Sequence, residues 1–364
     1  MIGRGRIARV ILVLVLATGC ATRPDLPMMQ AAESLQDMRQ IQLLAVTTRA
    51  RQSPGTNVFT RARSATPNHA VFTVAIPRDH RPGRIESIGR TGSAMAVTSQ
   101  GIVTSRAALL DLVAADAGPA RDVSIFVHGY NLNFGESLLR LAQLSADGVL
   151  HGTPVLFSWP SEARLQGYLY DRDSATVSRD ALAVLLADLA GDPRIGNIEV
   201  LAHSLGGWLA VEALRQLRLA GREDVLDRLD IVLAAPDIDM DVFAAQMAIV
   251  GPLRVPMKVL VAPDDRALIL SGRLSGEVPR LGTLKVTDPR AARLARAYNI
   301  AVLDISQARA SDRLGHDRYA WLGVSAGSAG SLRDLRRAGA FAVNAVGEIV
   351  AAPFGALGAA LATD

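Results

Sequence analysis

One serine, Ser204, lies where a short apolar run gives way to a segment with helical spacing of apolar residues, within the stretch NIEVLAHSLGGW at 197–208. The run at 200–202 is typical of a buried parallel strand, and the apolar residues after the serine recur at helical intervals. The chain must turn sharply at Ser204, which Ala202 and Gly206 flank. Small neighbours are needed there because the strand and helix backbones nearly touch and the serine adopts a strained φ/ψ. A hydroxyl held on such a turn is a candidate nucleophile for acyl chemistry.

A serine nucleophile needs a general base, and the strand–serine–helix arrangement has the chain order serine, acid, histidine. Of the six histidines only His316 follows Ser204 in the sequence. His203 adjoins the nucleophile and cannot fold its ring back onto the serine Oγ. His316 follows Gly315 in a loop after the last predicted strand. We therefore expect His316 to be the base.

Four carboxylates follow the strands that precede this histidine, and each is a candidate acid. Asp264 and Asp265 follow the run at 258–262, one strand before the strand that leads to the histidine, where a carboxylate can orient the imidazole. Asp237 and Asp239 follow the preceding strand and are the alternatives. Any of the four could instead cap the helix that comes next. The residues alone leave the choice open.

An oxyanion formed at the serine needs two hydrogen-bond donors. The residue after the nucleophile normally supplies one backbone N–H, here that of Leu205, and a loop after an early strand supplies the other. The first strand of the repeated units ends in His128-Gly129-Tyr130. Gly129 allows close approach of the backbone, and we expect the Tyr130 amide to be the second donor. We expect His128 itself to hydrogen-bond the loop backbone without taking part in the chemistry.

The elements that must position these residues are strands alternating with helices, a pattern that implies a parallel sheet with helices on both faces. The predicted strands cover 41–46, 69–76, 123–127, 155–157, 198–202, 231–234, 258–262 and 300–304, and the predicted helices cover 135–146, 175–190, 205–220, 241–250 and 288–298. A loop rich in Pro54, Gly55 and Asn57 separates the first two strands, and 97–114 fits neither pattern clearly. Active-site residues of such sheets lie beyond the carboxyl ends of the strands, where the candidates above are found.

Six motifs together give the chain a family resemblance. They are FVHGYN at 126–131, FSWP at 157–160, AHSLGG at 202–207, APDID at 235–239, DRAL at 265–268 and GH at 315–316. With them, residues 42–336, including Thr48-Arg49, resemble a largely uncharacterised esterase/lipase-like branch of the bacterial α/β-hydrolases. The resemblance implies the α/β-hydrolase fold, a mostly parallel central sheet with helices on both faces. It also favours Asp265 as the acid, because the family pattern places the acid before Arg-Ala-Leu. Ala202 in place of glycine and Asp317-Arg318 after the histidine depart from the pattern.

The amino terminus is typical of an export signal. Three arginines precede an apolar run at 10–17 that is too short to span a bilayer, and Thr18-Gly19-Cys20 follows. The segment resembles a bacterial lipoprotein signal in which Cys20 is lipidated, with Ala17 where leucine is usual; an ordinary secretory signal with an incidental cysteine is the alternative. We therefore expect a signal peptide at 1–20, a tether at 21–40, the hydrolase domain at 41–336 and an Ala/Gly-rich tail at 337–364. For the tail we expect a helix packed on the sheet rather than a second membrane contact.

Composition argues against other classes of function. The formal net charge is +4, no run of five basic residues occurs, and aromatic residues make up 4% of the chain, which argues against nucleic-acid binding. Cys20 is the single cysteine, so no disulfide forms within the chain. The chain lacks H-E-x-x-H, a cysteine cluster and a Gly-rich phosphate loop, so we expect no metal and no cofactor.

The expected function is therefore hydrolysis of a small-molecule carboxylic ester or a related acyl bond by Ser204, His316 and Asp265. The enzyme would sit at the cell envelope, exported and attached to a membrane by its lipid anchor. Two alternatives remain from the residues alone: a non-catalytic binding or scaffold module on the same fold, and an acyltransferase.

Overall fold

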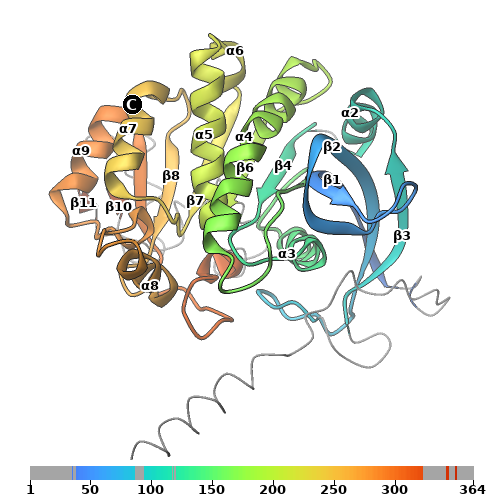
Figure 1. Cartoon of the computed structure of the whole chain (residues 1–364), viewed down its shortest axis with the longest axis horizontal. Coiled ribbons are helices and arrows are strands. Elements are labelled where there is room, and N and C mark those ends of the chain that lie inside the picture. Colours follow the sequence, from blue (N-terminus) through green and yellow to red (C-terminus); the bar gives the residue numbers. More distant parts are fainter. Residues whose placement is uncertain are drawn as a thin grey trace, which may run out of the picture.

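The computed structural model describes residues 35, 38–86, 94–116, 118, 120–322, 342–343 and 349–350. Its centre is a single mixed sheet in the order β11-β10-β9-β8-β7-β6-β4-β5-β1-β2-β3 (Figure 1). The strands are β1 (Arg39–Arg51), β2 (Phe59–Ile76), β3 (Ala96–Val103), β4 (Val123–Val127), β5 (Thr153–Ser158), β6 (Ile198–His203), β7 (Leu229–Ala234), β8 (Met257–Val261), β9 (Ile300–Asp304), β10 (Ala342–Val343) and β11 (Ile349–Val350). Strands β1 and β4–β9 pair in parallel, whereas β2, β3, β10 and β11 pair antiparallel with their neighbours.

Helices cover both faces of this sheet. They are α2 (Arg106–Asp116), α3 (Phe134–Ala146), α4 (Tyr168–Gly191), α5 (Leu205–Leu219), α6 (Glu223–Leu226), α7 (Met240–Val250), α8 (Arg266–Leu274) and α9 (Pro289–Tyr298), with short 3₁₀ turns η2 (Leu281–Thr283) and η3 (Arg318–Trp321). Along β6, Val200 and Ala202 belong to the core beneath α4, α5 and α7, whereas Leu201 belongs to the core beneath α3 and η3. Successive side chains of a strand point to opposite faces, so an uninterrupted apolar run serves two cores at once. The fold is therefore the expected α/β-hydrolase arrangement.

Local sequence explains where the helices near the site begin. Asn133 accepts a hydrogen bond from the N–H of Glu136, and the Glu136 side chain accepts one from the N–H of Asn133, which forms a capping box at the start of α3. Asp239 and Asp265 are simple N-caps of α7 and α8, because each side chain accepts from backbone N–H groups of the first turn. Each cap follows the carboxyl end of a parallel strand. These helices therefore start at the edge of the sheet where the candidate residues were expected.

The structure corrects several predicted boundaries. β2 begins at Phe59 rather than 69, because it pairs with an extended β1 across a half-exposed ribbon, and the predicted loop shrinks to 52–58. The ambiguous stretch at 97–114 divides into β3 and α2, and α4 starts at Tyr168 rather than 175. In the tail, the described residues are the strands β10 and β11 and not the expected helix. The reason is that β9 would otherwise leave a row of unpaired backbone groups, which β10 satisfies.

The predicted signal peptide, Cys20 and most of the tether lie outside the described residues. In the part of the chain that is described, none of the helices has the length and apolar character needed to cross a bilayer.

Candidate active site

Ser204 occupies the turn between β6 and α5 with φ 54° and ψ −123°, a conformation that residues other than glycine rarely adopt. Its backbone N–H donates to Ala234 O of the neighbouring strand at 2.9 Å. A Cβ at Gly206 would lie 2.4 Å from His128 O and 2.7 Å from Val127 O, both backbone atoms. The small residue predicted at this turn is therefore required by the close approach of β4, and the turn holds the serine at the carboxyl end of the sheet.

The loop after β4 lies directly against the serine. A Cβ at Gly129 would lie 2.9 Å from Ser204 Cβ, so only glycine allows this approach. The backbone of Tyr130 follows at once. Leu205 is the first residue of α5, where backbone N–H groups lack intrahelical acceptors and the helix dipole favours negative charge. The two predicted oxyanion donors thus belong to segments that converge on Ser204.

His316 lies in the segment after β9, and its Nδ1 is 2.7 Å from Asp265 Oδ2. Asp265 is fully buried, and its other oxygen accepts from Leu268 N at 3.0 Å as the cap of α8. The carboxylate therefore caps a helix and pairs with the imidazole at the same time. With Nδ1–H donating to this carboxylate, Nε2 of the neutral ring is left as the proton acceptor.

Burial alone would lower the pKa of His316, but the hydrogen bond to Asp265 and the negative charges of Asp265, Asp237 and Asp312 outweigh it. The net effect raises the pKa above its ordinary value. This environment stabilises the protonated imidazole, which is the form that a general base becomes once it has accepted a proton.

His203 connects the serine to the histidine loop. Its Nε2 lies 3.2 Å from His316 O, and the centres of the two imidazole rings are 4.5 Å apart. Burial, together with the nearby His316, lowers its pKa well below the ordinary value, so His203 is neutral and donates to that carbonyl. Since His203 precedes Ser204 directly, this contact attaches the loop of His316 to the residue next to the serine. Among the described residues no hydrogen bond joins Ser204 Oγ to His316 Nε2, and in unliganded sites such bonds are often long.

The other candidate acids have different partners. Asp264 pairs with Arg318 at 2.7 Å. Asp239 caps α7 through the N–H groups of Asp241 and Val242. Asp237 is buried and accepts from Tyr168 Oη and from Ser271 Oγ, with Arg280 Nε 3.2 Å away. Of the four carboxylates weighed from the sequence, Asp265 is the one hydrogen-bonded to His316.

Two aspartates hold the loop that carries His316. Asp312 Oδ1 accepts from Gly315 N at 2.6 Å and from His316 N at 2.9 Å. Asp317 Oδ1 accepts from Ser311 N at 2.8 Å. Asp317 turns back into its own loop, so the unusual residue after the histidine acts on loop shape.

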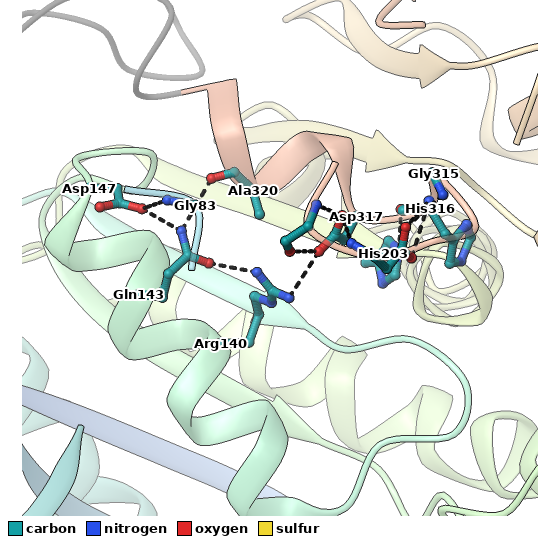
Figure 2. A network of polar contacts seen from close by, with 11 residues as sticks. Gly83, Arg140, Gln143, Asp147, His203, Gly315, His316, Asp317 and Ala320 are labelled. Carbon is teal, nitrogen blue, oxygen red and sulfur yellow. Dashed lines mark hydrogen bonds and ion pairs between the residues drawn. The ribbon is translucent and has the colours of Figure 1, made fainter. Parts of the chain in front are cut away.

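A chain of polar contacts leads from this loop to α3 (Figure 2). Arg140 bridges Asp317 and Gln143, with its Nη2 3.4 Å from Asp317 Oδ2 and its Nη1 2.8 Å from Gln143 Oε1. Gln143 Nε2 also lies within bonding distance of Asp147 Oδ2 and of Ala320 O. The segment that carries His316 is therefore attached to α3 by side chains.

His128 makes the backbone contacts expected of it. Its buried ring nitrogens lie 2.8 Å from Gly129 O and 3.1 Å from Trp159 O. Burial and the charge of Arg49 lower its pKa to about 3, so the ring is neutral. Sequence reasoning attached no role to Arg49 or Asp171, both buried beneath the loops after β4 and β5. The available signal for Arg49 was its place in the Thr48-Arg49 pair of the family resemblance; Asp171 had none.

No group of three or more histidine, cysteine, aspartate or glutamate side chains arranged to hold a metal ion occurs among the described residues.

A serine on a strained strand–helix turn, at the carboxyl edge of a mostly parallel sheet, defines a protein of the α/β-hydrolase class. The comparisons agree with this class. Residues 108–323 match the model of the family described as "Alpha/beta hydrolase of unknown function (DUF900)", which is more than half of the sequence. The chain belongs to this family.

Among solved structures, a "Putative hydrolase" from Agrobacterium vitis S4 is similar over 71% of this chain and 93% of its own, with 14% identity and a TM-score of 0.35. That score is too low to support an argument about function. No curated protein matches the chain.

Proposed function

We propose that this hydrolase is a serine hydrolase that cleaves a carboxylic ester or a related acyl bond with Ser204, His316 and Asp265. The observation that carries the proposal is the part-buried Asp265–His316 hydrogen bond of 2.7 Å, in a loop that contacts His203, the residue before a serine with positive φ. A scaffold module would have no need for both a strained serine and an imidazole whose pKa a buried carboxylate raises.

In the proposed reaction, Ser204 Oγ attacks the acyl carbon while His316 Nε2 takes its proton. The N–H groups of Tyr130 and Leu205 stabilise the oxyanion, and Asp265 stabilises the imidazolium. The imidazolium then returns the proton to the leaving alcohol, which leaves an acyl-Ser204 intermediate. Water activated by His316 releases the acid and restores the serine.

Replacement of the nucleophile tests the proposal most directly. Ser204→Ala should reduce turnover of a short p-nitrophenyl ester by on the order of 10⁶ and abolish labelling by a fluorophosphonate probe. Ser99→Ala, on the exposed edge strand β3, is the matched control and should behave as the unmodified protein. Turnover retained in Ser204→Ala would contradict the mechanism. A wild-type protein that neither turns over the ester nor reacts with the probe would indicate a scaffold.

The proposed location is the cell envelope, through lipidation of Cys20. Its support is the charged, apolar and small-residue pattern at 1–20. Cys20→Ala should move the protein from the membrane to the soluble fraction without changing its rate on a soluble ester. Unchanged membrane recovery would contradict the anchor.

A further inference from the structure

Arg49 and Asp171 are charged side chains inside the protein that the proposed reaction does not use. Arg49, near the end of β1, is 2% exposed, and Asp171, in the first turn of α4, is fully buried. Burial lowers the pKa of Arg49 to about 10, so it stays protonated at neutral pH. Burying an ionised group costs several kcal/mol, and such groups therefore need partners. Their partners are the backbones of the loops after β4 and β5.

Arg49 donates to carbonyl groups of both loops. Its Nη2 lies 2.8 Å from Leu132 O in the loop after β4, and its Nη1 lies 3.1 Å from Ser161 O in the loop after β5. Its Nε reaches Ser158 Oγ, at the end of β5, at 3.1 Å. One guanidinium therefore spans two loops that are separated by about thirty residues of sequence.

Asp171 accepts from the same two loops. Its Oδ2 lies 3.2 Å from Asn131 N, and its Oδ1 lies 2.6 Å from Glu162 N. Ser161 Oγ also donates to this carboxylate at 2.5 Å. The peptide group between Ser161 and Glu162 is thus held at both ends, its carbonyl by Arg49 and its N–H by the aspartate.

Both loops have a residue with a left-handed backbone next to these contacts. Asn131 has φ 62° and Ala163 has φ 57°. Such conformations persist when surrounding interactions determine them. Asn131 follows Tyr130 directly, so the contact that fixes the Asn131 amide also fixes the orientation of the adjacent peptide.

We propose that Arg49 and Asp171 act as a charge clamp, a pair of positioning residues that sets where the Tyr130 amide points toward the oxyanion. The inference rests on the proposed function. Arg49 binds backbone carbonyl groups and Asp171 binds backbone N–H groups of the same two loops. Together they fix the position of each loop and the orientation of its peptide groups. Loss of an oxyanion donor reduces kcat by about 10²–10³, and a displaced donor should reduce it by about 10- to 100-fold.

The test uses the full chain with Asp171→Asn and Arg49→Lys, which keep most of the packing. Rates are expressed per site titrated with the fluorophosphonate probe, so a misfolded fraction does not count. We expect kcat to fall about 10- to 100-fold with KM changed less than about twofold. The pH at half-maximal kcat/KM should stay unchanged, because the clamp does not contact His316.

Arg228→Lys is the matched control. Arg228 donates to three backbone carbonyls, Ala190 O, Ile195 O and Gly196 O, before the amino end of β6 and so at the opposite edge of the sheet. Its replacement should lower the thermal midpoint without changing kcat per titrated site.

Unchanged kcat per site in both clamp variants would overturn the inference while leaving the proposed function intact. A wild-type protein without turnover or labelling would instead defeat the proposed function. If neither variant folds, amide exchange of the wild-type protein decides: strong protection of the Asn131 and Glu162 amides supports the clamp, and rapid exchange of both overturns it.

Discussion

The two sides of the candidate site are held by different kinds of interaction. The nucleophile side is built on the central strands β4 and β6, where glycines let backbones touch and buried charges hold the loops. The base side is the segment after β9, attached by carboxylates to its own backbone and by Arg140 to α3 (Figure 2). At the turn of the nucleophile the main chain is closely packed, whereas the histidine loop is held by hydrogen bonds from side chains to its backbone and to α3.

The two kinds of interaction differ in how much a substitution disturbs the backbone around Ser204 and around His316. Backbone contacts inside a close-packed sheet leave no room to move, so a single added carbon must displace main chain. Contacts of partly exposed side chains are individually worth about 1 kcal/mol, so the loss of one contact of the histidine loop should cost little folding free energy. We therefore expect added volume at the turn of the nucleophile to affect folding, whereas the loss of a polar contact, on the base side or in the Arg49–Asp171 clamp, should affect catalysis.

The largest expected effect on the base side is that of Asp265→Asn. The amide can still cap α8, so the fold should survive, but it no longer holds the imidazole with Nδ1 protonated. By analogy with the corresponding change in a serine protease, kcat should fall by about 10⁴. Steady-state kinetics together with thermal unfolding check this expectation. Asp264→Asn changes the neighbouring carboxylate, which pairs with Arg318, and should leave kcat within about threefold. A larger loss of kcat in Asp264→Asn than in Asp265→Asn would assign the acid to Asp264.

On the nucleophile side, Gly206→Ala should act through stability. Its Cβ would meet two backbone carbonyls at 2.4 and 2.7 Å. Overpacking of this kind destabilises by about 3 kcal/mol, or about 10 °C in the thermal midpoint. Gly207→Ala is the paired comparison, because its Cβ would meet the Pro236 side chain at 3.2 Å, and it should lose much less. Equal losses would show that the approach of β4 does not constrain this turn.

A smaller effect should follow from Asp312→Asn, again on the base side. His316 must be neutral to accept a proton, and its pKa is raised, so the acid limb of the kcat/KM profile should lie above about pH 6.5. Removing the Asp312 charge lowers that pKa, so the limb should move to lower pH, with kcat reduced by less than about tenfold as the loop loosens. A limb that stays in place would show that Asp312 acts on loop shape alone.

Chain order and local pattern were enough to find much of the fold and the site. The strand at 123–127 was predicted with the bounds that β4 has, and β6, β7 and β9 were located to within two residues. These strands are buried on both faces, so their sequences are plainly apolar. The first ten residues of β2, 59–68, were missed, because their exposed polar side chains look like those of a loop. The tail strands were missed as well: β10 pairs with β9 and β11 pairs with β10, and their own sequence does not indicate these partners.

The sequence by itself reduced the candidate bases to one, because His316 is the one histidine that follows Ser204 in the chain order of this fold. It also indicated the small residues Ala202 and Gly206 at the turn, because the strand–serine–helix pattern calls for them, although the atoms that crowd Gly206 belong to β4 and its loop. Tertiary structure places Asp265 on His316 and Asp264 on Arg318, a choice that the residues alone left open and the family resemblance favoured. Tertiary structure alone decided that Arg49 and Asp171 hold the same two loops. Those contacts join segments far apart in the chain, and the order and register of the sheet, rather than any nearby residue, set their distances.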